Sequence, residues 1–496
     1  MVTIPKSAIL SVRSCSFSGS IPFAPYGQAA QLGLALAVYI ELLKGRDSRW
    51  FGYLQSLPQE PVDIALFWGS DELDRCRPDE AREDRKLART WVVGTEIDRE
   101  LYDEDGVCLL DGLREYYHTV AERLLSSEYA SRPQPYSIAG FMHAYSLVSS
   151  RAFLVDAYHG LAMVPIADAF NHAQENDVHL ESDYDVCVIC GSNTPCPHDE
   201  TSMVANDDGR REGESIDTCD MVTNRPVAAG GEVFNTYGER LTNAQLLVRY
   251  GFALEGNEND MVSWQMDDLP PAPWMEREAF RTNVYEPILR AWPRDLRWVE
   301  SERVYNPPRA YTVVRIEDRR ESPTRRWPRR HLRPALDVNG DAKLSHPLWV
   351  YCALCATVRV RGPMEDVDEL LRFLGQLAEM VHSLEGEAAG SEGEDGDAGE
   401  EEGVGHHRVG DADSDEPRME VLDELVRTVE VVCREREKQL RGGRIGRLGE
   451  MLDNLGPGRV RTRYAIAQVL SERTILESCL WAWQQLGAGK REEVVQ

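Results

Sequence analysis

The sequence predicts an α+β fold, in which a compact β region with a helical insertion is followed by a mostly helical region. Residues 26–44 and 461–486 have helical periodicity. Residues 161–251 instead consist of short apolar runs broken by Gly, Pro, Asn and Asp, which is typical of a compact β structure. The length of 496 residues suggests two to four domains, at roughly 100–200 residues per domain.

The predicted elements begin with a strand edge at residues 2–4, which ends at Pro5. The helix predicted over 26–44 ends in Lys-Gly, a common C-terminal signal, and charged segments up to about residue 150 indicate further helices. Ser137 is the expected N-cap of a helix that runs to about Arg151, because a serine hydroxyl can accept a hydrogen bond from a backbone N–H of the first turn.

Beyond about residue 260 the sequence predicts more helices. The segment 385–418 is acidic, Gly-rich and of low complexity, which predicts disorder. Cys352 and Cys355 lie in an apolar, helix-like run and are expected in the core. The helix predicted over 461–486 is expected to pack through one apolar face, formed by Ile466, Val469, Leu470, Leu476, Cys479, Leu480 and Trp483.

Charge and composition limit the class of protein. The net charge is −29, and about −17 remains outside residues 385–416, so general binding to nucleic-acid phosphate is not expected and a basic protein partner fits better. No stretch approaches the ~18 uninterrupted apolar residues of a membrane span, and the N-terminus lacks the apolar run of a signal peptide. Eleven scattered cysteines suit reduced thiols in the cytosol or nucleus.

Three short segments carry the candidate chemistry. Ser150-Arg151-Ala152-Phe153 comes first, residues 164–172 read VPIADAFNH, and residues 230–238 read GGEVFNTYG. The chain then continues as LTNAQLLVRYGF over residues 241–252. Individually these signals are weak, since an Asn-His pair is more often a turn than a ligand and a Tyr-Gly pair at a strand end is usually structural.

Together, in this order and spacing, the segments resemble the SET domain of lysine methyltransferases of the Rubisco large-subunit methyltransferase class. F-N-T-Y-G resembles members that modify ribosomal and nuclear proteins. The resemblance implies a SET β-fold over residues 1–260, with a pseudoknot that joins the Asn-His and Tyr-Gly segments and a helical insertion at about 26–150. It extends more loosely over 261–496, as a helical substrate-binding domain that contains the disordered segment 385–418.

The resemblance also implies an activity, the transfer of a methyl group from S-adenosylmethionine to a protein lysine. Asn171 and His172 would hold this cofactor, and Arg151 would contact its carboxylate, for which a planar guanidinium is well suited. Tyr237 is the expected catalytic residue and a further cofactor contact, because its hydroxyl would orient the methyl group and the amine. The alternative for these residues is a purely structural role.

The substrate lysine must lose a proton before it can attack, because its pKa is normally ~10.4. A narrow, dry channel beside a sulfonium would lower that pKa. By resemblance, Tyr250 and Phe252 would line the channel, and the carbonyls of Arg151 and Phe153, with the region of Asp168, would receive the lysine. The alternatives are core packing for the two aromatic residues, a surface ion pair for Arg151 and a turn or cap for Asp168.

The expected partner is a protein substrate that presents a lysine, in the nucleus or cytoplasm, with no nucleic acid and no membrane, and the chain is expected to be a monomer. A second hypothesis is a non-catalytic, SET-derived protein-binding module. It arises because members of this class usually begin with a Gly-rich, cofactor-binding hairpin, whereas MVTIP at the start of this sequence resembles the strand that follows it.

A separate cluster suggests a metal. Cys187, Cys190, Cys196 and His198 have the spacing C-x2-C-x5-C-x-H, and four such ligands could bind zinc tetrahedrally. The family that the chain resembles does not generally need zinc here, so the alternative is an insertion loop with free cysteines.

Overall fold

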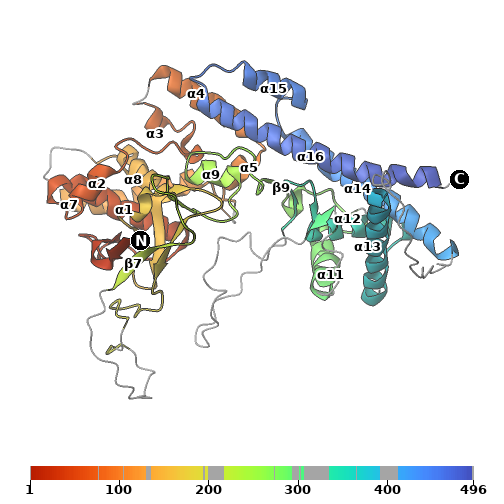
Figure 1. The fold of residues 1–496 in the computed structure, drawn as a ribbon, viewed down its shortest axis with the longest axis horizontal. Helices are drawn as coiled ribbons and strands as arrows, with labels where there is room; N and C mark the ends of the chain where they lie inside the picture. Colours follow the sequence, from red (N-terminus) through yellow and green to blue (C-terminus); the bar gives the residue numbers. More distant parts are fainter. Residues whose placement is uncertain are drawn as a thin grey trace. The chain divides into compact units, whose positions relative to one another are not determined.

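A computed structural model describes residues 2–493 with several gaps (Figure 1). The residues left out within this range are 76–77, 104–105, 130–135, 194–195, 199–216, 273, 293–300, 302, 306–334, 365 and 391–411. The chain divides into two compact units. The first unit comprises Met1–Val92, Ile97–Glu255 and Leu455–Ala465, and the second comprises Val93–Glu96, Gly256–Asn454 and Ile466–Gln496. The predicted domain boundary near residue 260 stays a prediction.

Two sheets form the β part of the first unit. The larger sheet has the strand order β1-β7-β6-β8-β5, with bounds Val2–Pro5, Thr218–Thr223, Val178–Ser182, Phe234–Asn235 and Asn171–His172. The smaller has the order β2-β4-β3, with bounds Leu10–Ser11, Gly160–Met163 and Ala152–Asp156. β1 confirms the strand predicted at residues 2–4. It pairs antiparallel with β7, so that strands from opposite ends of the unit's sequence lie together.

Apolar side chains from both sheets form a shared core. Ile4, Val155, Ala162, Val178 and Met221 are all buried in one cluster. They come from β1, β3, β4, β6 and β7. Apart from Ala162, which precedes the buried Met163, each lies between residues that are more exposed or polar, as expected for sheets with one buried face. This core holds β6, the strand that pairs with β8.

Most helices of the first unit lie in the predicted insertion at about residues 26–150, and the last one follows it. They are α1 Gly27–Lys44, α2 Phe51–Ser56, α3 Asp71–Asp74, α4 Asp79–Val92, α5 Glu96–Glu100, α6 Leu109–Tyr116, α7 Glu122–Tyr129, α8 Ile138–Arg151 and α9 Asn243–Arg249. α1 and α8 pack side by side (Figure 1). A Cβ on Gly140 of α8 would lie 2.6 Å from the Tyr39 hydroxyl of α1, so this approach requires glycine. Ser137 caps α8 by accepting from the Gly140 N–H at 3.1 Å, as predicted.

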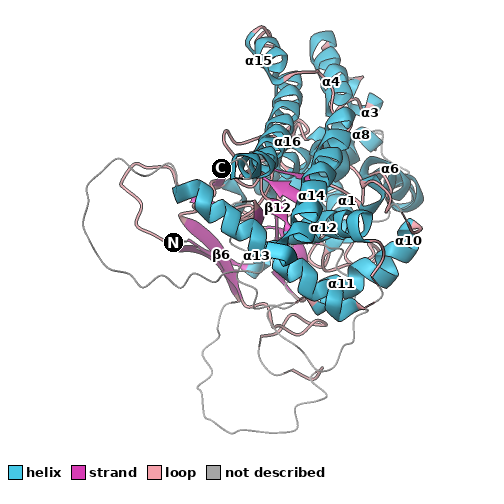
Figure 2. Cartoon of the chain, turned by 90° about the vertical axis from the view of Figure 1, so that its right-hand side faces the viewer, coloured by secondary structure: helices cyan, strands magenta, loops and turns pink. Residues whose placement is uncertain are grey.

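The second unit combines a short sheet with long helices. Its sheet has the order β10-β12-β11-β9, with bounds Val304–Tyr305, Leu344–Ser345, Asp337–Asn339 and Met261–Ser263. Its helices are α10 Arg277–Phe280, α11 Glu286–Ala291, α12 His346–Arg361, α13 Val367–Gly390, α14 Ala412–Gln439 and α15 Ile445–Asp453, and most of α16 Val460–Glu493 also belongs to it. α12 and α14 lie side by side (Figures 1 and 2). Cys352 and Cys355 are buried in α12, as predicted.

Predictions for the C-terminal half have different outcomes. The apolar face of α16 is confirmed, because Ile466, Val469, Leu476 and Trp483 are buried. The disorder predicted for 385–418 is wrong at both ends, which belong to α13 and α14, while residues 391–411 lie outside the described chain. Among the described residues, no helix combines the length and hydrophobicity needed to cross a membrane.

The N-terminal end of that acidic segment is helical because Glu385 has partners. Glu385 is buried, pairs with Arg303 at 3.1 Å and accepts a hydrogen bond from Ser301 at 3.1 Å. A buried carboxylate with two such partners holds the last turns of α13 in place.

Asp337 in β11 makes the stability of the second unit depend on pH. It is 2% exposed, and burial, with a smaller contribution from the charge of Glu96, raises its pKa to about 7. Its unfolded pKa is ~3.9, so the folded state holds the proton more tightly, and the stabilisation is complete below about pH 4 and lost as the pH rises through about 7. We expect Asp337→Asn to raise the free energy of unfolding at about pH 8 relative to the unaltered chain, but not at about pH 4.

Urea denaturation at both pH values measures this effect. Asp341→Asn is the matched control, because Asp341 is exposed and lies in the turn that follows β11. An Asp337→Asn variant with the same pH dependence as the unaltered chain would show that Asp337 does not hold a proton in the folded state.

Candidate active site

The two central motifs meet through strand pairing. β5 pairs parallel with β8, which sets Asn171 opposite Phe234 and His172 opposite Asn235. The Ala173 N–H continues this ladder by donating to the Asn235 carbonyl at 2.9 Å. The structure thus joins the Asn-His and Tyr-Gly segments, more than 60 positions apart in the sequence, as the resemblance implied.

Tyr237 is held at its backbone and at its hydroxyl. Its backbone N–H donates to Nδ1 of His172 at 3.1 Å, and its hydroxyl donates to the Phe170 carbonyl at 3.1 Å. The His172 and Tyr237 rings stack with centroids 5.2 Å apart. Burial lowers the pKa of His172, which favours the neutral ring that can accept this bond. His172, which was predicted to bind the cofactor, therefore also positions the predicted catalytic tyrosine.

Four rings form an aromatic cluster, which comprises His172, Tyr237, Tyr250 and Phe252. Tyr250 stacks on Tyr237 at 4.7 Å, and the Phe252 centroid lies 6.0 to 6.3 Å from the other three. All four side chains are only half-buried, so a ligand can reach them. Burial raises the pKa of both Tyr237 and Tyr250, which keeps their hydroxyls protonated. The cluster offers an apolar surface with hydroxyl groups that donate and accept hydrogen bonds but do not act as bases.

The chain reaches this cluster through a turn that only glycine allows. Gly251 has φ +81°, and a Cβ there would lie 2.8 Å from the Asp63 carbonyl oxygen. Before it, Thr242 and Gln245 form a capping box at the start of α9, which explains the Thr-x-x-Gln spacing. The Asn243 side-chain amide donates to the Leu254 carbonyl at 2.9 Å and accepts from the Leu254 N–H at 2.8 Å. These two bonds fix the segment that carries Tyr250 and Phe252.

Arg151 and Asp168 form a second group beside the cluster. Nη1 of Arg151 donates to the Asp168 carbonyl at 2.8 Å and lies 3.8 Å from its carboxylate. Burial raises the pKa of Asp168, although Tyr53 and Arg151 lower it. The charges of both residues act on the pKa of Tyr237, with Arg151 lowering it and Asp168 raising it, so the group lies within electrostatic reach of Tyr237. The ion pair is the alternative that the sequence left open for Arg151.

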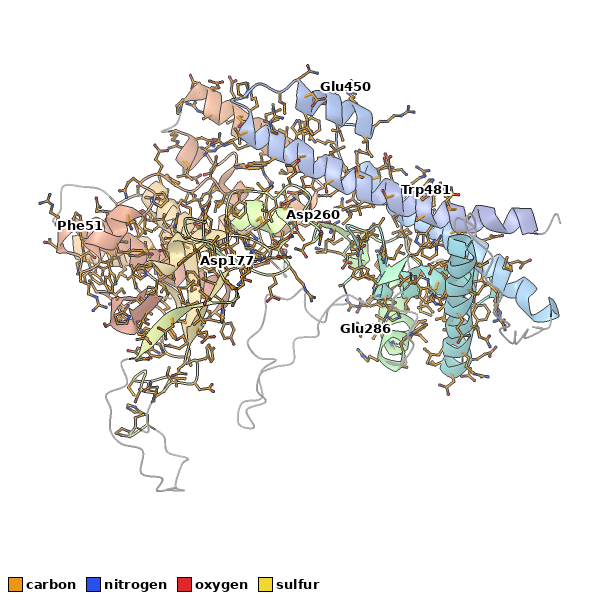
Figure 3. The ribbon with its side chains drawn as sticks, viewed as in Figure 1. Phe51, Asp177, Asp260, Glu286, Glu450 and Trp481 are labelled. Atoms are coloured by element: carbon orange, nitrogen blue, oxygen red, sulfur yellow. The ribbon has the colours of Figure 1, made fainter. Side chains whose placement is uncertain are left out.

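Tyr53 was missed in the sequence. It lies in α2, whose first residue, Phe51, is labelled in Figure 3. Its hydroxyl donates to the Asp168 carboxylate at 2.8 Å, and burial together with the Asp168 charge raises its pKa far above the usual value. No local pattern marks this tyrosine, because its partner is 115 positions away.

Asp177, labelled in Figure 3, organises the F-N-T-Y-G segment and was also missed. One carboxylate oxygen accepts from the Phe234 N–H at 2.9 Å and the other from Arg225 at 2.6 Å. These two bonds lower its pKa, the Phe234 N–H contributing most. Glu232 is a further unpredicted residue, which accepts from the Asn171 side chain at 2.7 Å.

Backbone strain marks the P-I-A-D-x-x-N-H segment. Ile166 has φ +74°, which is rare for a β-branched residue, and it is 56% exposed. Strain of this kind concentrates at functional sites, and Ile166 lies two residues before Asp168. The Phe153 side chain, by contrast, packs against the core shared by the two sheets and has a structural role. The role predicted for the Phe153 carbonyl, which is to receive the lysine, stays a prediction.

The four residues of the predicted metal cluster also come together. Cys187, Cys190, Cys196 and His198 each offer a ligand atom, and these atoms lie within 4.8 Å of one another. They follow β6 in the insertion that leads to β7.

Curated relatives of the chain are lysine methyltransferases by name, although no protein-family model matches. Ribosomal lysine N-methyltransferase 3 of Saccharomyces cerevisiae is 26% identical over 369 residues, covering 61% of this chain and 64% of that protein. N-lysine methyltransferase SETD6 of Homo sapiens is 27% identical over 296 residues, covering 58% of this chain and 53% of that protein. The chain therefore matches about half to two thirds of the length of these relatives. They confirm the resemblance that the motifs predicted.

Solved structures show the same fold. The SET domain of LSMT bound to lysine and AdoHcy matches with a TM-score of 0.50 and 16% identity, over 97% of this chain and 81% of that one. Rubisco LSMT bound to AdoMet also matches with a TM-score of 0.50 and 16% identity, over 98% and 82% of the two chains. The predicted α+β SET fold followed by a helical region is thus confirmed.

Proposed function

We propose that this chain is an S-adenosylmethionine-dependent protein-lysine N-methyltransferase. The observation that carries the proposal is the position of Tyr237, which the Asn-His strand holds in a half-buried aromatic cluster within a SET fold. The names of the relatives support the same chemistry. S-adenosylmethionine would supply an electrophilic methyl group on a sulfonium, and the residues of the chain would position the lysine that receives it.

The residues at the site fit this cofactor. Nε of Arg151 is buried and has no hydrogen-bond partner among the described residues, so the guanidinium has a donor left for a carboxylate. Asn171 is exposed and offers a side-chain amide next to His172. Nη1 of the same guanidinium donates to the Asp168 carbonyl, which holds Arg151 in place. We therefore propose Asn171, His172 and Arg151 as cofactor-binding residues.

The aromatic cluster would prepare the lysine for attack. Burial against the rings of Tyr237, Tyr250 and Phe252 removes water from an ammonium group, and this lowers its pKa and favours the neutral amine. The Tyr237 hydroxyl already donates to the Phe170 carbonyl, so its oxygen lone pairs remain to accept an amine N–H. Its raised pKa keeps the hydroxyl protonated, and we propose that it orients the amine and does not take its proton. Such positioning can contribute up to ~7–11 kcal/mol.

The proposed substrate is a lysine in a basic protein, either ribosomal or nuclear. The net charge of −29 attracts basic segments, and the names of the relatives include a ribosomal lysine methyltransferase. We further propose that the carbonyls of Arg151 and Phe153 and the region of Asp168 receive the lysine. A monomer in the cytoplasm or nucleus fits this function.

Calorimetric titration of S-adenosylmethionine into the full chain tests the cofactor site. We expect saturable binding that Asn171→Ala weakens on the order of 10-fold or more, because a side-chain amide that holds the cofactor contributes about 1–3 kcal/mol. Asn454→Ala is the matched control, since Asn454 is an exposed residue after α15 whose side chain donates to the Glu450 carbonyl one turn away. A folded chain that does not bind the cofactor, or an Asn171→Ala variant with unchanged affinity, would contradict the assignment.

A further inference from the structure

The insertion between β6 and β7 carries a group of soft ligands outside the active site. We name Cys187, Cys190, Cys196 and His198 the Cys3His cluster. Their four ligand atoms lie within 4.8 Å of one another. Nothing in the methyl-transfer chemistry uses them, so the cluster needs an explanation of its own.

The distances within the Cys3His cluster fit a tetrahedral metal better than hydrogen bonds. Nδ1 of His198 lies 3.7 Å from the Cys187 sulfur and 3.6 Å from the Cys196 sulfur. A neutral ring nitrogen has one lone pair or one proton, so it can hydrogen-bond well to only one thiol. With bond lengths of ~2.3 Å to sulfur and ~2.0–2.1 Å to nitrogen, a tetrahedral zinc site places sulfur and nitrogen about 3.6 Å apart.

The backbone around the first two cysteines already forms a tight knuckle. The Gly191 N–H donates to the Cys187 carbonyl, and the Cys187 N–H donates to the Ser192 carbonyl, both at 2.8 Å. Gly191 has φ +75°, and a Cβ there would lie 2.9 Å from the Tyr158 ring, so glycine allows the knuckle to approach the β3–β4 turn.

Lys6 fixes both ends of the same insertion to the body of the first unit. Its ammonium is 2.8 Å from the carboxylates of Asp156 and Asp217, and it donates to the Asp183 carbonyl at 3.2 Å. Lys6 and Asp156 are buried, so these are strong anchors. The insertion therefore leaves β6 and enters β7 at a fixed point, through Asp183 and Asp217.

Apolar packing does not account for the arrangement between these anchors. In the described part of the insertion, Val186 is buried, but Val188 and Ile189 are 50% and 58% exposed. A segment that buries so little apolar surface gains its order from a crosslink, as small metal-binding loops do.

We propose that Cys187, Cys190, Cys196 and His198 bind one Zn²⁺ in a closed, structural site. The three cysteines would lose their thiol protons on binding, and His198 would coordinate through Nδ1 as a neutral ring. Thiolate and imidazole ligands select zinc over magnesium or calcium. Because protein ligands fill all four positions, the metal joins the segment after β6 to the rest of the insertion and takes no part in methyl transfer.

Metal analysis of the purified full-length chain tests this proposal. We expect about one zinc per chain after gel filtration with a weak chelator, and we expect Cys190→Ser to remove it. Cys108→Ser is the matched control, because Cys108 is a half-buried free cysteine of the same unit outside the Cys3His cluster and should keep full zinc content. Zinc that is absent from the unaltered chain, or that survives in Cys190→Ser, would overturn the proposal.

Cobalt substitution of the unaltered chain is a second test of the metal site, which does not depend on whether Cys190→Ser folds. Co²⁺ in a site with three thiolates and one imidazole shows intense tetrahedral visible bands and sulfur-to-cobalt charge transfer. We expect these bands to saturate at about one cobalt per chain and to disappear when Zn²⁺ is added. A weak spectrum typical of octahedral cobalt would overturn the proposal.

Discussion

Replacing Tyr237 by Phe is expected to reduce the rate of methyl transfer on the order of 100-fold, which is the effect of losing one preorganised polar group at a reacting centre. The variant keeps the ring, which stacks on His172 and Tyr250, and loses only the hydroxyl that bonds to the Phe170 carbonyl. The cofactor residues and the backbone bond to His172 remain, so the affinity for S-adenosylmethionine should change little. Single-turnover methylation and calorimetry measure the two quantities separately.

Tyr102→Phe is the matched control for this variant. Tyr102 belongs to the same unit, but its side chain is 44% exposed, and we expect an unchanged rate. Thermal unfolding of Tyr237→Phe should show that the variant remains folded. A Tyr237→Phe variant that keeps the full rate would show that the hydroxyl does not orient the amine.

Replacing Arg436 by Ala is expected to destabilise the second unit by about 3–5 kcal/mol, the usual effect of removing one partner from a buried ion pair. The Arg436 side chain is fully buried, and Nη2 lies 2.9 Å from the Glu96 carboxylate and 3.3 Å from that of Glu472. The same guanidinium donates to the carbonyls of Ser263 and Gly94. The substitution would therefore leave two buried carboxylates and two carbonyls without their shared donor.

Urea denaturation measures this loss, with Arg434→Ala as the control. Arg434 lies on the same helix, but it is exposed, and its ion pair among the described residues is with Glu430 one turn away, so its loss should change the stability by less than about 1 kcal/mol. Burial raises the pKa of Glu472, and Arg436 opposes this effect. Without Arg436, protonation of Glu472 should offset part of the loss at low pH. Equal stabilities of Arg436→Ala and Arg434→Ala would show that this buried network does not hold the unit together.

The part of the candidate site that could be predicted is the part with local signals. Asn171, His172, Tyr237, Tyr250 and Phe252 stand in contiguous motifs of characteristic order, and the structure brings all five together. Capping also has a local signal, which is why Ser137 was identified correctly.

Residues whose role depends on a distant partner could not be predicted. Tyr53, Asp177 and Lys6 lie in ordinary surroundings in the sequence, and their roles follow from partners that only the tertiary structure brings near. The disorder predicted at Glu385 was wrong for the same reason. An acidic, Gly-rich composition predicts disorder unless a buried partner such as Arg303 is known. Composition reports the average tendency of a segment, whereas one buried ion pair decides the state of its end.

Mass spectrometry of ribosomal and nuclear proteins incubated with the full chain and S-adenosylmethionine tests the central claim most directly. We predict methyl groups on at least one lysine with the unaltered chain, and a strong reduction with Tyr237→Phe. If the folded chain binds the cofactor but leaves the lysines of ribosomal and nuclear proteins unmodified, the activity proposed for this SET fold is contradicted, and the fold serves to bind a protein without methylating it.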